Sequence, residues 1–117
     1  MDKNGVEVDH IWMDAGWYGQ SAAFSPDEFE GDWFSYTGDW RVNPNNPPDG
    51  LLDVSEIIHK TGRKFILWFE PERVRKNAPI YNEHPEYLLS NPADPDNMLL
   101  NLGDEKAWNY CFETISA

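Results

Sequence analysis

Cysteine, histidine and basic residues are all scarce in this chain of 117 residues. The single cysteine, Cys111, excludes an internal disulfide, and the three histidines lie too far apart in sequence to suggest a zinc motif. Nine Lys and Arg against 21 Asp and Glu give a formal net charge of -12, and so negative a surface repels phosphate backbones and anionic lipid headgroups. We therefore expect no nucleic-acid partner, no membrane partner and no metal site.

Long hydrophobic runs are missing as well. The longest, at residues 65–69 and 98–100, are far too short to cross a bilayer, and no apolar segment of a signal peptide follows the first four residues. We expect a soluble chain and favour the cytoplasm as its location. The length suits one domain with a single modest core.

Aromatic residues, by contrast, are abundant, because they make up 15% of the chain and include six tryptophans. Disordered segments are poor in aromatics, and long irregular loops that stay ordered in compact domains usually carry function. Such a loop is predicted between residues 15 and 48, where helix and strand periodicity is absent but eight aromatics occur: Trp17, Tyr18, Phe24, Phe29, Trp33, Phe34, Tyr36 and Trp40.

A strand, a helix and a second strand are predicted on the two sides of this loop. Residues 8–13 are mostly apolar and end at Asp14, as a strand would. Asp49 can cap a helix whose apolar residues recur at helical spacing, and Gly62 can end it. Residues 64–69 are almost continuously apolar, which is typical of a strand buried on both faces of a parallel sheet. Together these elements predict a right-handed crossover.

The second half of the chain is predicted to contain short elements and loops. Pro85 can open a short helix, and residues 98–102 can form a brief extended segment. Residues 94–97 resemble a calcium loop only superficially, because the spaced ligands and terminal Glu of an EF-hand are missing, and turn chemistry explains them better. Asp104 can cap a final helix with one apolar face, formed by Ala107, Trp108, Cys111, Phe112 and Ile115.

The unusual residues follow the two predicted parallel strands, where α/β proteins bind their ligands. Asp14 and Trp17 come after the first strand, and Trp68 and Glu70 end the second. We therefore expect an α/β fold that is part of a (β/α)₈ TIM barrel. A complete barrel needs about 250 residues, so this chain can supply two to three βα units. Residues 1–117 are then expected to be the N-terminal part of a catalytic barrel domain, truncated at both ends.

Carboxylates and aromatic rings at these strand ends suit a carbohydrate site. A carboxylate such as Asp14 can accept two hydroxyl hydrogen bonds at once, and bonds to a charged group are roughly twice as strong as neutral ones. Trp68 can stack on the apolar side of a sugar ring. The further candidates for substrate contact are Trp17 and, within one short segment, Asp39 and Trp40.

A structural role remains open for each of these residues. Asp14 can instead cap the following turn or pair with an arginine, and Trp68 can belong to the core, since large aromatics are usually buried. Glu70 and Glu72 form a candidate carboxylate pair. Because they lie close to Arg73 in sequence, however, we expect at least one of them to be in a structural ion pair.

Six short segments form a series along the chain: WMDAGWYG (12–19), GDW (38–40), PDGL (48–51), LWFEPERV (67–74), HPE (84–86) and LLNLG (99–103). In order and spacing, this series resembles glycoside hydrolase family 36, the microbial α-galactosidases or melibiases. The resemblance covers essentially the whole chain, and WFEPERV is its most specific element.

The resemblance implies a (β/α)₈ barrel that hydrolyses terminal α-linked galactose, as in melibiose or raffinose, with retention of configuration and with no metal or organic cofactor. By this likeness Asp14 would bind the galactose 4- and 6-hydroxyls, and Trp68 would form a wall of the sugar subsite. The chain departs from the family in two places. Many members have a second acid where Ala15 stands, and many have an arginine near the position of residues 96–98.

The two catalytic carboxyl groups of the family are expected to lie beyond Ala117. Retaining hydrolysis needs a nucleophile and an acid/base about 5 to 5.5 Å apart. The family nucleophile is an Asp in a Lys-Trp-Asp type motif on the next strand, and the acid/base follows later. Neither motif occurs in this sequence, so the chain alone is predicted to be inactive and to bind sugar weakly at best.

Other functions remain open at the level of sequence. The parent can be a relative that prefers N-acetylgalactosamine or transfers galactose to another sugar, as the Asp14-Ala15 departure suggests. The chain can also be a non-catalytic sugar-binding module, because its loop is rich in aromatics and its catalytic pair is absent. No feature of the sequence favours a purely structural role for the chain. Whether the parent protein is a homo-oligomer is left open.

Overall fold

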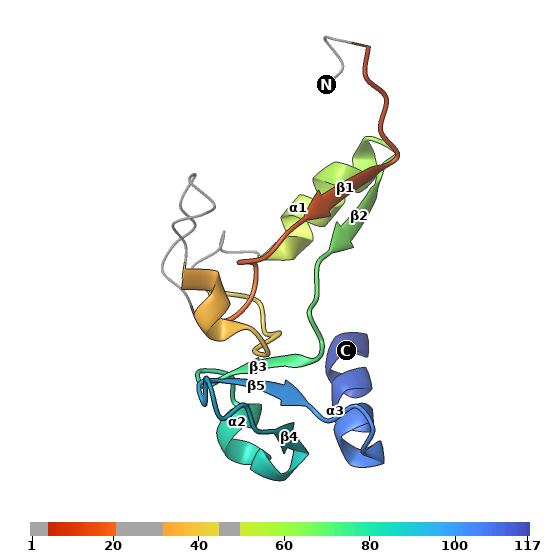
Figure 1. Ribbon diagram of the computed structural model, residues 1–117. Coiled ribbons are helices and arrows are strands. Elements are labelled where there is room, and N and C mark those ends of the chain that lie inside the picture. Colours follow the sequence, from red (N-terminus) through yellow and green to blue (C-terminus); the bar gives the residue numbers. More distant parts are fainter. Residues whose placement is uncertain (1–4, 21–31, 45–49) are drawn as a thin grey trace.

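The computed structural model describes residues 5–20, 32–44 and 50–117 of the chain. Two groups of elements follow one another (Figure 1). The first consists of strand β1 (His10–Met13), helix α1 (Leu51–Lys60) and strand β2 (Lys64–Leu67). The second is a small antiparallel sheet with two α-helices and a 3₁₀ helix, and residues 68–72 connect the groups. Asp49, Phe24 and Phe29, which the sequence reasoning named, lie outside the described residues.

The strand, helix and strand predicted from the sequence are present. β1 and β2 pair in parallel, with a register that runs from His10 opposite Lys64 to Met13 opposite Leu67. Both strands are shorter than predicted, because β1 begins at His10 and β2 ends at Leu67. The ladder nevertheless extends by one hydrogen bond on each side, from the Lys64 amide to the Asp9 carbonyl and from the Trp68 amide to the Met13 carbonyl.

Helix α1 ends where the sequence predicts. The amides of Thr61 and Gly62 bond to the last helical carbonyls, and Gly62 has a φ of 76°, which a side chain would disfavour. Leu51, Val54 and Ile58, the predicted apolar face, are half-buried. The helix therefore covers one side of the two strands.

The second group is a three-stranded antiparallel sheet of order β3-β5-β4, which the sequence reasoning missed. It contains β3 (Arg73–Arg75), β4 (Leu88–Leu89) and β5 (Asn97–Leu100). Only an extended segment at residues 98–102 was expected here. Strands of two to four residues are too short to show an alternating pattern. The described residues thus contain one complete β-α-β unit beside this sheet, and the count of two to three βα units stays a prediction.

Two short helices and a longer one pack around the sheet. Helix α2 (Ile80–Glu83) leads into the 3₁₀ helix Pro85–Tyr87, whose first residue is the proline predicted to open it. Helix α3 (Glu105–Ser116) begins at Asp104, whose carboxylate accepts hydrogen bonds from the amides of Lys106 and Ala107. The predicted cap is therefore confirmed.

The buried core lies between the antiparallel sheet and these helices. Its members come from β3, β5, α2, α3 and the loop after β3: Val74, Ala78, Ile80, Leu100 and Ala107. A further 3₁₀ helix, Asp32–Tyr36, leads into Gly38, which approaches the same region. A Cβ atom on Gly38 would lie 3.0 Å from the Arg73 carbonyl oxygen and 3.2 Å from the Ala78 Cβ, so only glycine fits without a shift of the backbone.

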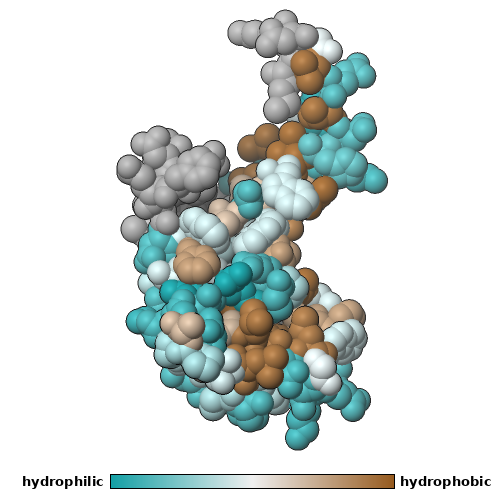
Figure 2. All heavy atoms as spheres, in the orientation of Figure 1, coloured by the Kyte–Doolittle hydropathy of each residue, from teal (hydrophilic) through white to brown (hydrophobic). Residues whose placement is uncertain are grey.

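Hydrophobic side chains remain on the surface in both groups (Figure 2). Trp12 and Leu52 are exposed in the first group, and Trp108 and Phe112 are 49% and 57% exposed on α3. The rings of Trp108 and Phe112 stack with centroids 5.3 Å apart. Two strands and one helix cannot cover both faces of a sheet, which accounts for the exposure around β1.

Among the helices that the structure describes, none is long and apolar enough to cross a membrane.

Replacing Asp104 with alanine is expected to lower the free energy of unfolding by about 1 kcal/mol, because two amides at the start of α3 lose their acceptor. Urea unfolding followed by circular dichroism measures this. Asp104→Ser retains a capping oxygen and serves as the matched control, with an expected loss of less than about half that value. Equal losses in the two variants would contradict the capping role.

Candidate functional site

Asp14 and Trp68 lie next to each other at the carboxyl ends of the parallel strands. Each directly follows the last paired residue of its strand, Met13 or Leu67, and the Trp68 amide donates to the Met13 carbonyl at 3.0 Å. Phe65 and Leu67 line a surface hollow together with residues of α1. Because side chains alternate along a strand, Asp14 and Trp68 continue the opposite side of the sheet.

Three aromatic rings surround the indole of Trp68. Tyr18 stacks on it with centroids 6.3 Å apart and an interplanar angle of 24°. Trp33 and Trp40 meet it edge to face, each with a centroid distance of 6.2 Å. These rings come from the loop after β1 and from residues 33–40, and such arrangements are favourable beyond the area that they bury. Trp68 is half-buried and belongs to a fixed aromatic cluster, which we define as Trp17, Tyr18, Trp33, Trp40, Trp68 and Phe69.

Trp17, the next member of the aromatic cluster, is buried, with only 3% of its surface exposed. Its indole Nε1–H donates to the Trp68 carbonyl oxygen at 2.9 Å. Its ring packs against Trp40 at 6.2 Å and against Phe69 at 5.0 Å. The structure therefore places this sequence-predicted residue within the protein interior, in contact with the strand end that carries Trp68.

Asp39 is also buried, at 3% exposure, and its carboxylate is paired. Arg41 donates to both of its oxygens, from Nε at 2.6 Å and from Nη2 at 2.8 Å. This hydrogen bonding, together with the charge of Asp39, raises the pKa of the Arg41 guanidinium. The Asp39 carboxylate therefore already has a bidentate partner within its own loop.

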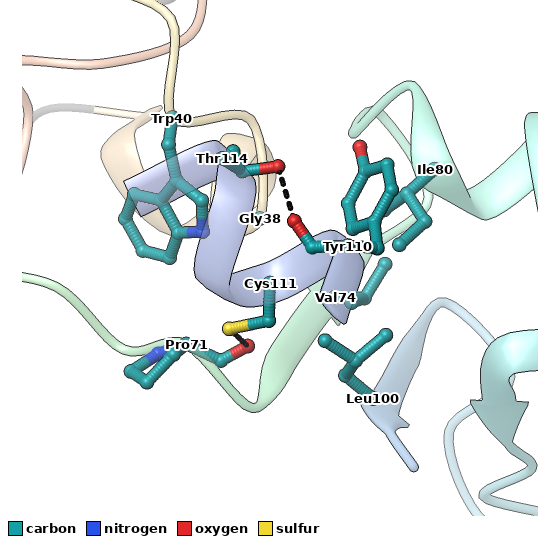
Figure 3. A pocket seen from close by; sticks show the side chains of 9 residues that line it. All are labelled: Gly38, Trp40, Pro71, Val74, Ile80, Leu100, Tyr110, Cys111 and Thr114. Carbon is teal, nitrogen blue, oxygen red and sulfur yellow. Dashed lines mark hydrogen bonds between the residues drawn. The ribbon is translucent and has the colours of Figure 1, made fainter. Parts of the chain in front are cut away.

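Trp40 connects the aromatic cluster to a small cavity beside α3. Figure 3 shows Trp40 and Tyr110 on opposite sides of this region, and Thr114, Cys111 and Val74 also line the cavity. The cavity volume is about 10 Å³. That volume holds about one water molecule and no sugar ring.

Tyr18 is a site residue that the sequence reasoning did not select. It has no exposed surface, and its hydroxyl lies 3.4 Å from the Thr37 hydroxyl. Burial raises its pKa to about 12; the hydrogen bond to Thr37 opposes this shift, and the negative charges of Glu70 and Asp14 add to it. The negative charges of both carboxylates therefore disfavour ionisation of the Tyr18 hydroxyl. The only sequence signal was its position directly after Trp17 at a strand end.

Glu70 forms the ion pair that was expected of at least one of the two neighbouring glutamates. Its carboxylate accepts from the Arg73 Nε at 2.6 Å, and Arg73 also donates to the Asn97 side chain at 3.0 Å. The guanidinium groups of Arg73 and Arg75 lie over the Phe34 ring, at 5.6 and 4.5 Å from its centroid. Glu70 therefore fixes the turn between β2 and β3.

The carboxylates of residues 94–97 are also engaged in ion pairs. Asp94 pairs with Arg75 at 3.2 Å, and Asp96 pairs with Lys76. These contacts join the loop before β5 to the end of β3, consistent with the turn interpretation. Within the described ranges, no group of three or more His, Cys, Asp or Glu side chains is arranged to hold a metal ion.

Asp14 differs from the other carboxylates of the site because it is exposed. Its Oδ1 accepts a hydrogen bond from the amide of Ala15 at 2.9 Å, which is the turn contact considered in the sequence reasoning. A carboxylate has room for further hydrogen-bond donors. The described geometry therefore presents an accessible anionic acceptor and a half-buried indole at the ends of two paired strands, and both suit contact with a hydroxylated ring.

Comparison with known proteins finds α-galactosidases both by family model and by sequence identity. The family model described as Melibiase matches residues 1–117. An α-galactosidase of Lactobacillus acidophilus is 33% identical over 118 residues, which cover 97% of this chain and 15% of that protein. The α-galactosidase AgaA of Geobacillus stearothermophilus is 32% identical over 117 residues, which cover 96% of this chain and 14% of that protein. The chain thus spans about 15% of the length of these relatives.

Solved structures agree in fold. The crystal structure of AgaA from Geobacillus stearothermophilus superposes with a TM-score of 0.72 at 31% identity, over 93% of this chain and 15% of that one. An α-galactosidase from Lactobacillus brevis gives a TM-score of 0.73 at 29% identity, over 98% of this chain and 15% of that one. A doubly substituted AgaA, solved in complex with raffinose, gives 0.71 at 31% identity, with coverage of 93% and 15%.

The raised pKa of Tyr18 predicts a loss of stability in strong base. The unfolded chain releases the phenolic proton near the ordinary value of about 10, whereas the folded chain keeps it until about 12. The contribution is therefore fully present below pH 10, and the free energy of unfolding falls as the pH rises from 10 to 12. Urea unfolding at a series of pH values measures this dependence.

Tyr18→Phe is expected to flatten this dependence but not to abolish it, because burial also raises the pKa of Tyr110. Phenolate absorbance of the folded protein gives an independent measure, since the variant should lose one late-titrating group. An unchanged slope between pH 10 and 12 in the variant would contradict the assignment to Tyr18.

Proposed function

This chain belongs to the melibiase family, the α-galactosidases of glycoside hydrolase family 36, and on that premise we propose that its parent protein hydrolyses terminal α-linked galactose with retention of configuration. Oligosaccharides such as melibiose and raffinose are the proposed substrates. The observation that carries the proposal is that the exposed Asp14 and the half-buried Trp68 directly follow the paired ends, Met13 and Leu67, of two parallel strands. The complex of a Geobacillus relative with raffinose supports the substrate class.

In this proposal Asp14 and Trp68 bind the non-reducing galactose. The Asp14 carboxylate accepts hydrogen bonds from two neighbouring hydroxyls, the 4- and 6-hydroxyls in the family likeness. The Trp68 ring forms a wall of the subsite, held in place by the aromatic cluster around it. Neither side chain takes part in bond cleavage, so both contribute to substrate binding and orientation.

Cleavage of the glycosidic bond is assigned to residues outside this chain. A retaining mechanism requires two carboxyl groups about 5 to 5.5 Å apart, one as nucleophile and one as acid and then base. We propose that both are supplied by further strands of a (β/α)₈ barrel and that the 117-residue chain alone does not turn over substrate. No metal or organic cofactor takes part in the proposed reaction.

Ala15 supports a second candidate within the same reaction type. It occupies the position beside Asp14 where many members of the family carry another acid. A smaller, neutral residue there leaves space for a bulkier sugar substituent, as in N-acetylgalactosamine. Rates on the aryl α-galactoside and on the aryl α-N-acetylgalactosaminide separate the two, and a higher kcat/KM on the latter would overturn the galactose assignment.

The longer protein that carries this chain is expected to hydrolyse p-nitrophenyl α-galactoside, and Asp14→Ala is expected to lower its kcat/KM about 150- to 25,000-fold. The factor follows from the loss of two charge-assisted hydrogen bonds, each of about 1.5–3 kcal/mol.

Asp53→Ala is the matched control, because Asp53 is an exposed carboxylate in the first turn of α1. It should leave kcat/KM unchanged. Release of p-nitrophenol gives the rates. Absence of any turnover by the unsubstituted protein would refute the proposed activity, whereas equal effects of the two substitutions would refute the role of Asp14.

A further inference from the structure

The peptide of Trp68 is held on both sides by the β1 strand and the loop that follows it. Its amide donates to the Met13 carbonyl at 3.0 Å, and its carbonyl accepts from the Trp17 indole Nε1–H at 2.9 Å. Trp68 lies just beyond the end of β2. Its carbonyl is therefore fixed by a side chain from the neighbouring loop at the point where the strand ladder stops.

Trp17 is itself held firmly in this position. Its carbonyl accepts from the Asn43 amide at 2.9 Å, and the next residue, Tyr18, forms an antiparallel bridge with Val42. The Trp17 ring lies against Trp40 and Phe69. A side chain that is 3% exposed and enclosed in this way cannot reach a sugar in the site.

We propose that Trp17 is a positioning residue for α-galactoside binding, which acts by setting the place of Trp68 relative to Asp14. This inference rests on the proposed function. The Trp17 hydrogen bond joins two chain segments that are 51 residues apart, and each segment carries one of the proposed sugar contacts. Asp14 lies in the same short loop as Trp17, so a change at Trp17 alters the spacing between the carboxylate and the indole. The role replaces the direct substrate contact that the sequence suggested for Trp17.

The test is Trp17→Phe in the longer enzyme, because phenylalanine retains an aromatic ring but lacks the N–H donor. The KM for p-nitrophenyl α-galactoside and the Kd for galactose, measured by calorimetry, are both expected to rise about 10-fold, because the Trp68 carbonyl loses its hydrogen-bond partner and Trp68 shifts. The kcat is expected to change less than about 3-fold, because the interaction serves ground-state and transition-state binding alike. Trp108→Phe is the matched control, since this indole is exposed on α3, and it should change neither constant.

A purely structural role for Trp17 gives a different result. At a temperature well below the melting transition of both proteins, a substitution that only destabilises the fold lowers the melting temperature and leaves KM and Kd unchanged, because essentially all molecules are still folded. That outcome would overturn the inference. If the unsubstituted enzyme binds galactose without hydrolysing galactosides, the proposed activity fails and the Kd ratio still decides the role of Trp17. If the enzyme neither binds nor hydrolyses, both proposals fall.

Discussion

The in-register parallel pairing of β1 with β2 is the constraint on which the candidate site depends. It aligns Met13 with Leu67, so the next residue of each strand, Asp14 or Trp68, emerges at the same edge of the sheet. A slip of one residue would send one of these side chains to the side that α1 covers. The Trp17 hydrogen bond to the Trp68 carbonyl then joins the same two segments just beyond the strands. The chemistry of the site is therefore a consequence of backbone register before it is a consequence of side-chain type.

Aromatic rings packed against Trp68 then fix the orientation of its side chain at this strand end. Tyr18, Trp33 and Trp40 restrict the Trp68 ring, and Trp17 binds its backbone. Large rings achieve this at low entropic cost, because each has only two side-chain torsions to fix. Four of the six tryptophans belong to this cluster, so the high tryptophan content of the chain is explained mostly by packing around Trp68, and only Trp68 of the cluster is proposed to contact the sugar.

The features that the sequence predicted well are local ones. The Asp104 cap, the helix that opens at Pro85 and the end of α1 at Gly62 each depend on a few neighbouring residues, and the structure contains all three. The antiparallel sheet was missed because β3 and β4 are too short for a periodic pattern and because β3 pairs with β5, which lies beyond β4 in sequence. The burial of Trp17 was missed for the same reason, since Phe69 and Asn43, which surround it, are far along the chain. Sequence therefore located the strand ends that carry the candidate site but could not separate the residues that support Trp68 from those that face solvent.

The residues that build the site are far apart in sequence, so its contacts cannot all form until the later residues have been synthesised. The hydrogen bond from the Trp17 indole can form only after Trp68, 51 residues later in the chain, has been synthesised. Closing a loop of that length costs chain entropy before the contact can form, and contacts between residues far apart in sequence slow folding. While a ribosome has released only the first strand and its loop, the rings of that loop lack their contacts with Trp68 and Phe69. The nascent chain is then most in need of protection from association with other chains, and that exposure ends only when β2 and the residues after it have emerged.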